Sequence, residues 1–190
     1  MAGRKCPICK QFDDPEEMTQ LPNKRFVHTE KCLDIHNERE EKQKQENIEW
    51  SNLFEYIKEL HGIIAIPTRN IKRLHQLRDG NDIVNGKTEK RYKQGPSYGL
   101  MLEAYKLQED KIKWFISSVL NDGKDASDIN KCISMMLNGL NTAWQVRQTK
   151  IKLEKQIKNE LSKTFEKDMS FPDATNIKKR RDDGDISHLL

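Results

Sequence analysis

Three cysteines and one histidine near the N-terminus constrain this chain more than any other feature of its sequence. Two residues separate Cys6 from Cys9, and further along the chain three residues separate His28 from Cys32. This spacing is typical of a zinc site with one nitrogen and three sulfur ligands. Four protein donors complete a tetrahedral shell and leave no open position for a catalytic water. We therefore expect Zn²⁺ in a structural role.

The residues around these ligands predict a small module over residues 1–36. Residues 6–9 (Cys-Pro-Ile-Cys) predict a tight turn, and residues 25–27 predict a short extended run. His28 and Cys32 are four residues apart, which would place both on one face of a helix. A turn, a loose hairpin and a helix whose first turn supplies two ligands predict a treble-clef-like arrangement. His36 lies one turn further along, so it remains an alternative to Cys32 as the fourth ligand.

Beyond this module the pattern predicts helices. Residues 37–47 carry no apolar side chain, and we interpret them as a charged linker or a helix extension. Between residues 48 and 165 apolar side chains recur at helical spacing, with breaks at Gly62 and Pro67. We predict a mainly α fold, in which the zinc module is followed by a helical domain (48–165) with a long C-terminal helix and by a disordered tail (166–190).

Composition narrows the class of protein further. The chain is 34% charged and has a mean hydropathy of -0.90. No segment approaches the roughly 18 to 20 apolar residues needed to cross a bilayer. Three of the four cysteines belong to the predicted metal cluster, which is unlike a disulfide scaffold. We expect a soluble cytoplasmic protein without a membrane partner.

The middle of the chain is its most basic part and suggests nucleic acid as a partner. Residues 48–95 contain 9 Lys and Arg against 6 Asp and Glu. Phosphate contacts from a predicted helix after Pro67, and from the basic residues around Tyr92, would suit DNA more than RNA. Two alternatives explain the same pattern. The basic residues of the helix would form an ordinary solvated face, and those around Tyr92 would belong to a mobile loop. The candidate residues are Arg69, Arg73, Lys87, Lys90, Arg91 and Lys93.

A protein partner is the alternative. Residues 182–185 are mostly acidic and lead to the apolar end Ile186–Leu190, which could bind another protein together with the long helix and the zinc module. The nearly neutral charge of the zinc module favours this alternative. We expect no enzymatic activity, because the chain has neither a nucleotide-binding glycine loop nor a hydrolase nucleophile elbow.

A family resemblance supports the metal prediction. The Cys6-x2-Cys9 pair, Arg25-Phe26-Val27-His28 and Cys32-Leu33 resemble the treble-clef module of LIM-type fingers. Together with residues 52–60 and 95–106, they more closely resemble small uncharacterised proteins of phages and prophages of Gram-positive bacteria. That module usually has two residues between its last two ligands, whereas this chain has three. The resemblance implies a phage-encoded zinc protein, and we expect a nucleic-acid-binding or accessory role in replication or transcription.

Overall fold

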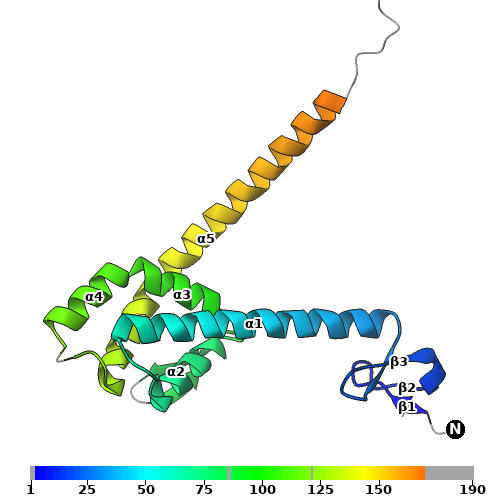
Figure 1. Ribbon diagram of the computed structural model, residues 1–190, viewed down its shortest axis with the longest axis horizontal. Helices are drawn as coiled ribbons and strands as arrows, with labels where there is room; N and C mark the ends of the chain where they lie inside the picture. Colours follow the sequence, from blue (N-terminus) through cyan, green and yellow to red (C-terminus); the bar gives the residue numbers. More distant parts are fainter. Residues whose placement is uncertain (1–2, 85–86, 121, 170–190) are drawn as a thin grey trace, which may run out of the picture. The chain divides into compact units, whose positions relative to one another are not determined.

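The computed structural model describes residues 3–84, 87–120 and 122–169 (Figure 1). The chain is mainly helical with a long C-terminal helix, which confirms the predicted fold class. It separates into two compact units, Met1–Trp144 and Gln145–Leu190. The N-terminal elements are β1 (Arg4–Lys5), β2 (Phe12–Asp13), the 3₁₀ turn η1 (Pro15–Glu17), β3 (Met18–Gln20) and β4 (Phe26–His28). They are followed by α1 (Lys31–His61), α2 (Thr68–Arg78), β5 (Asn81–Val84), β6 (Lys87–Lys90), α3 (Tyr98–Leu107), α4 (Glu109–Ser118) and α5 (Ala126–Met169).

Two short antiparallel hairpins form the N-terminal module, which we define as residues 3–36. β1 pairs with β2 and β3 pairs with β4, with Lys5 opposite Phe12 and Met18 opposite His28. The module has its own small hydrophobic core, in which two of the predicted ligands take part. The buried members of this core are Cys6, Met18, Leu21, Val27 and Cys32.

Helix α1 is a single helix of 31 residues that begins in this module (Figure 1). Residues 37–47, predicted to be a linker or a helix extension, are helical and belong to it. Ion pairs with i,i+4 spacing lie along this polar stretch, between Glu38 and Lys42 at 3.8 Å and between Glu40 and Lys44 at 4.0 Å. Such exposed pairs each stabilise a helix by only about 0.3–0.5 kcal/mol. They therefore add modest stability to a stretch of α1 that remains in solvent.

The connection from α1 to α2 follows the predicted breaks. Gly62 ends α1 in a left-handed conformation with φ of 60°, and its N–H caps the helix on the carbonyl groups of residues 58 and 59. Pro67 occupies the cap position of α2, and Thr68 is the first helical residue. The ring of Pro67 fixes its own backbone angle, and this end of α2 has no side-chain cap hydrogen bond.

The helical core is built from the apolar faces predicted by the periodicity. Leu53 and Ile57 of α1, Leu74 of α2, Tyr105 of α3 and Ile133 of α5 are fully buried together. Fourteen further side chains are partly buried against this cluster, including Trp50 and Phe54. This core is separate from that of the N-terminal module, because the buried clusters share no residue.

A hairpin lies where the sequence predicted only a loop. β5 and β6 pair in antiparallel fashion, with Asn81 opposite Lys90 and Val84 opposite Lys87. The sequence between the strands is Asn-Gly, which is the strongest short signal for a two-residue hairpin. The turn formers at residues 79–82 and the wholly polar residues of β6 favoured a loop over a hairpin in the sequence.

Helix α5 is 44 residues long and runs to Met169, four residues past the predicted end of the helical domain. Its residues in the second unit expose a run of apolar side chains at helical spacing, among them Val146, Leu153 and Ile157. The remainder of the predicted disordered tail, residues 170–190, lies outside the part of the chain that the structure describes.

Candidate metal centre

The four predicted ligands come together in the N-terminal module. One ligand atom from each of Cys6, Cys9, His28 and Cys32 lies within 4.8 Å of the other three. Cys6 and Cys9 belong to the turn between β1 and β2, His28 ends β4, and Cys32 lies in the first turn of α1. A turn, a hairpin strand and a helix therefore meet at one point.

Backbone hydrogen bonds hold the turn that carries the first two cysteines. The N–H of Cys6 donates to the carbonyl of Gln11 at 2.9 Å, and the N–H of Lys10 donates back to the carbonyl of Cys6 at 3.0 Å. Lys10 closes the turn with a φ of 68°, in the left-handed region. This backbone brings both sulfur atoms to the same side of the turn.

The placement of His28 differs from the prediction. We expected His28 and Cys32 on one face of a helix, but α1 begins only at Lys31 and His28 is the last residue of β4. Its ring reaches the cluster across the hairpin, with Nδ1 3.3 Å from the sulfur of Cys9. The i,i+4 spacing suggested one helix for both ligands, but this prediction is wrong because residues 29 and 30 form a turn before the helix starts.

Asp13 is a residue of this site that the sequence did not indicate. One of its carboxylate oxygens lies 3.4 Å from Nε2 of His28, on the side of the ring away from the cysteines. A carboxylate behind a ligating histidine orients the ring and selects its tautomer. In the sequence Asp13 reads as part of a turn, and only the pairing of β1 with β2 brings it to His28.

His36 is not part of the cluster. Its Nε2 lies 3.4 Å from a carboxylate oxygen of Glu40, one turn further along α1. The four atoms that converge include the sulfur of Cys32 instead. Of the two alternatives for the fourth ligand, the geometry favours Cys32.

The electrostatics of the cluster favour a bound cation. Burial raises the pKa of the Cys6 thiol, but hydrogen bonds from the backbone N–H groups of Cys9, His28 and Ile8 outweigh burial and lower it to about 6. Burial raises the pKa of Cys32 to about 11, and the neighbouring sulfur atoms of Cys9 and Cys6 act in the same direction. Negative charge on the neighbouring sulfur atoms opposes ionisation of Cys32, and a bound divalent cation would offset that repulsion.

The donor set fits zinc. Zn–S bonds of about 2.3 Å and Zn–N bonds of about 2.1 Å place neighbouring ligand atoms of a tetrahedron ~3.4–3.8 Å apart. The observed atoms need to move inward by at most about 1 Å to reach that geometry. Thiolate and imidazole are also the donors that Zn²⁺ prefers. Bound there, the ion would tie the two hairpins to the start of α1.

The residues predicted for nucleic acid on α2 have unequal environments. Arg73 is half-buried, and its guanidinium donates to the backbone carbonyl of Asn130 at 2.8 Å and to the hydroxyl of Ser134 at 3.1 Å. Burial lowers the pKa of this guanidinium. Arg69 is exposed and lines a hollow of about 360 Å³ beside Lys72 and Arg73. Arg73 therefore links two helices, whereas Arg69 faces solvent.

The other four predicted residues lie on or just after β6. Lys90 donates to the backbone carbonyl of Asp79, and Arg91 lies 3.2 Å from a carboxylate oxygen of Asp82. Lys87 and Lys93 are exposed. Lys90 and Lys93 line a hollow that also contains Glu46 and Asp79, so the charge there is mixed.

Comparison with known proteins places the chain in a phage family. The family model described as SPbeta prophage protein YorH matches residues 6–188, which is nearly the whole chain. The chain therefore belongs to the SPbeta prophage protein YorH family. No curated protein and no solved structure matches it significantly. Among the helices that the structure describes, none has the length and apolar character required to cross a membrane.

Proposed function

We propose that this prophage protein is a zinc-stabilised, non-enzymatic protein that binds nucleic acid in phage replication or transcription. The zinc part of the proposal is supported by the convergence of three sulfur atoms and one ring nitrogen within 4.8 Å of one another. Four protein donors fill a tetrahedral shell, so the ion would stabilise the module and would not activate water.

Metal analysis of purified variants tests the zinc site. We expect about one zinc per chain in the wild-type protein, and loss of zinc in Cys9→Ser and in His28→Ala. Two matched variants serve as controls, since His36→Ala and Cys132→Ala remove a histidine and a cysteine outside the cluster. Both controls should retain the metal. Another metal, or retention of zinc by His28→Ala with loss in His36→Ala, contradicts the proposed ligands.

The nucleic-acid part of the proposal rests on the hollow beside α2. Its lining includes the three cationic side chains of Arg69, Lys72 and Arg73 and contains no carboxylate. Unopposed cations in a concave surface concentrate positive potential and attract phosphate groups. The hollow near Lys93 supports the proposal less, because its acidic members Glu46 and Asp79 offset the lysines.

Titration at two salt concentrations tests this binding. Labelled single-stranded and duplex DNA, and single-stranded RNA, are titrated with the zinc-loaded protein and followed by fluorescence anisotropy. Affinity should fall as salt rises, because bound phosphates release counterions. We expect the tightest binding to DNA. The absence of binding at low salt, or affinity that is indifferent to salt, contradicts the proposal.

A protein-binding adaptor is the second candidate, and the exposed face of α5 favours it. Val146, Leu153 and Ile157 are each about half exposed and follow one another at spacings of seven and four residues. They lie on one narrow stripe of the helix. Pull-down with the intact chain and with a chain ending at residue 169 tests the role of the predicted tail. Equal recovery of partners by both chains argues against a tail-dependent adaptor.

A further inference from the structure

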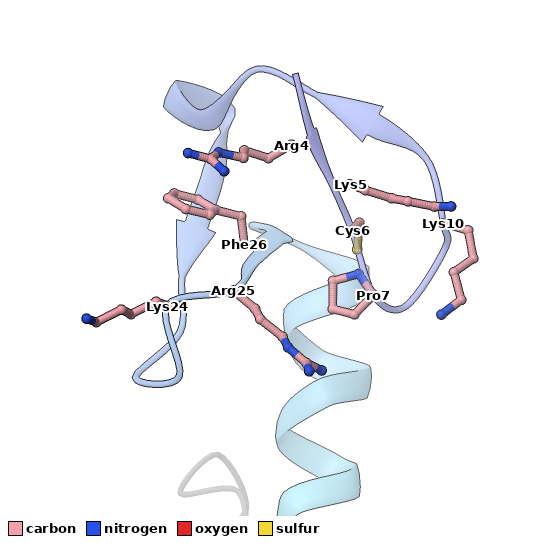
Figure 2. A pocket seen from close by; sticks show the side chains of 8 residues that line it. All are labelled: Arg4, Lys5, Cys6, Pro7, Lys10, Lys24, Arg25 and Phe26. Carbon is pink, nitrogen blue, oxygen red and sulfur yellow. The ribbon is translucent and has the colours of Figure 1, made fainter. Parts of the chain in front are cut away.

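A third hollow, of about 560 Å³, lies on the N-terminal module (Figure 2). Of its eight lining residues five are basic and none is acidic. Figure 2 shows that the labelled side chains come from both hairpins, with Lys5 and Lys10 extending to one side and Lys24 to the opposite side. We call it the basic hollow, and its cationic members are Arg4, Lys5, Lys10, Lys24 and Arg25.

The basic hollow is assembled by the same folding that forms the metal cluster. Arg4, Lys5 and Lys10 come from β1 and the turn after it, whereas Lys24 and Arg25 come from the turn between β3 and β4. The ligand Cys6 is itself part of the lining. A metal that joins the two hairpins therefore also holds the two groups of cations together.

The near-neutral charge of the N-terminal module conceals this concentration of cations. Residues 3–36 contain six Lys and Arg and six Asp and Glu. Five of the six basic residues line the hollow, whereas four of the acidic residues fall within residues 13–17. Within the described ranges, none of the five cations forms an ion pair with a carboxylate. Clustered cations without carboxylate partners suit an anionic ligand with several phosphates.

An exposed aromatic ring lies beside the hollow. Phe12 of β2 is the strand partner of Lys5, its side chain is 68% exposed, and the ammonium of Lys5 is 5.6 Å from the centre of its ring. Cations for phosphates beside an exposed ring on which a base can stack are the combination that binds single strands. Duplex bases are stacked inside the helix and cannot use the ring.

Two of the lysines occupy backbone positions that favour glycine. Lys10 has a φ of 68° and Lys24 has a φ of 63°, and both are at the rim of the hollow. A glycine would adopt this conformation without strain. Each position instead carries a lysine that belongs to the lining of the hollow.

We propose that the basic hollow binds the phosphodiester backbone of single-stranded nucleic acid, with a base stacked on Phe12. The inference rests on the proposed nucleic-acid-binding function, and it names both the surface and the form of nucleic acid. It adds a site for single strands on the zinc module to the hollow beside α2 on which the proposed function rests.

Paired variants of the zinc-loaded full chain test the site. Lys24→Glu combined with Arg25→Glu should weaken single-strand binding and make the slope of log affinity against log salt shallower by about 0.7 for each phosphate that is no longer neutralised. Lys31→Glu is the matched control, because Lys31 is the one basic residue of the module outside the hollow. Phe12→Ala should lower single-strand affinity about fivefold or more and leave duplex affinity unchanged.

The outcomes separate this inference from the proposed function. If the wild-type protein binds no nucleic acid, both fall. If the hollow variants bind like the wild type while Arg69→Glu with Lys72→Glu abolishes binding, only the inference falls. An equal loss of single-strand and duplex affinity in Phe12→Ala overturns the single-strand assignment. Zinc content shows whether each variant is folded, and Lys24→Gly provides a second variant that removes a cation at a position where glycine relieves strain.

Discussion

Lys24 is held in the left-handed backbone region, with a φ of 63°. For a residue with a side chain this conformation costs about 1–2 kcal/mol. Glycine avoids that strain, but it loses about 0.5–1 kcal/mol more conformational entropy on folding, which offsets part of the gain. We therefore expect Lys24→Gly to stabilise the N-terminal module by about 0.5–1 kcal/mol. Urea unfolding followed by NMR signals of the module measures this change. Lys31→Gly, at a helical position, should give no gain, and a destabilised Lys24→Gly would contradict the strain argument.

His61 should make the helical core sensitive to pH. Its side chain is 3% exposed, Nδ1 lies 2.6 Å from the carbonyl oxygen of Gly123, and Nε2 is buried without a hydrogen-bond partner among the described residues. Burial lowers the pKa of His61, while the Gly123 carbonyl and the charge of Asp128 act in the opposite direction. The unfolded chain therefore binds a proton more readily than the folded chain does.

This difference in pKa fixes the sign of the effect. The contribution of neutral His61 to stability is fully present above the unfolded pKa of about 6.5 and is lost as pH falls below that value. Denaturant unfolding followed by circular dichroism at several pH values measures it. The variant His61→Gln should have a flatter dependence below pH ~6.5 than the wild type. His36→Gln, outside the helical core, should keep the wild-type dependence, and identical curves for His61→Gln and the wild type would refute the assignment.

At the scale of elements, Arg73 connects α2 to α5. Its guanidinium donates to groups of Asn130 and Ser134, and Nε has no partner within the described part of the chain. Arg73→Ala leaves the Asn130 acceptors without these donors, so we expect a loss of about 1–3 kcal/mol in unfolding free energy. Arg69→Ala is the matched control on the same helix, since Arg69 is exposed. Comparable unfolding free energies for both variants would show that Arg73 does not link the helices.

At the scale of the molecule, the described part of the chain contains two hydrophobic clusters that differ in size. The cluster of the N-terminal module has five buried side chains, two of them cysteines of the candidate metal site, whereas the helical cluster has fifteen. A structural zinc ion contributes about 10–16 kcal/mol in small modules. Removal of the metal should therefore unfold the module and leave the helical core folded.

A chelator tests this division. Trp50, Trp114 and Trp144 all lie in the helical part, so tryptophan fluorescence reports on that part alone. We expect EDTA to abolish the dispersed NMR signals of residues 3–36 while the melting temperature by tryptophan fluorescence stays the same. A parallel fall of that melting temperature would show that the two clusters unfold as one.

Local patterns in the sequence were enough to predict the helices and the four residues that form the Cys/His cluster. The apolar spacing around Leu53, Leu74 and Ile133 predicted helix faces that are buried, because one face of a helix must leave water. The Cys-x2-Cys turn predicted a pair of sulfur ligands, because a tight turn brings two such side chains together. Both signals depend on residues a few positions apart.

What only the tertiary structure decided depends on residues that are distant in sequence. The pairing of β1 with β2 brings Asp13 to His28, and the turn before α1 keeps His28 off the helix. Folding of two hairpins collects Arg4, Lys10 and Lys24 around one hollow, although the module carries equal numbers of acidic and basic residues. The sequence by itself determined the helical class and indicated the four Cys and His side chains, because helix faces and the Cys-x2-Cys and His-x3-Cys pairs are patterns over a few neighbouring residues. Contacts between elements placed Asp13 beside His28 and gathered the basic residues of the module around the hollow. Spacing along the chain does not encode such contacts.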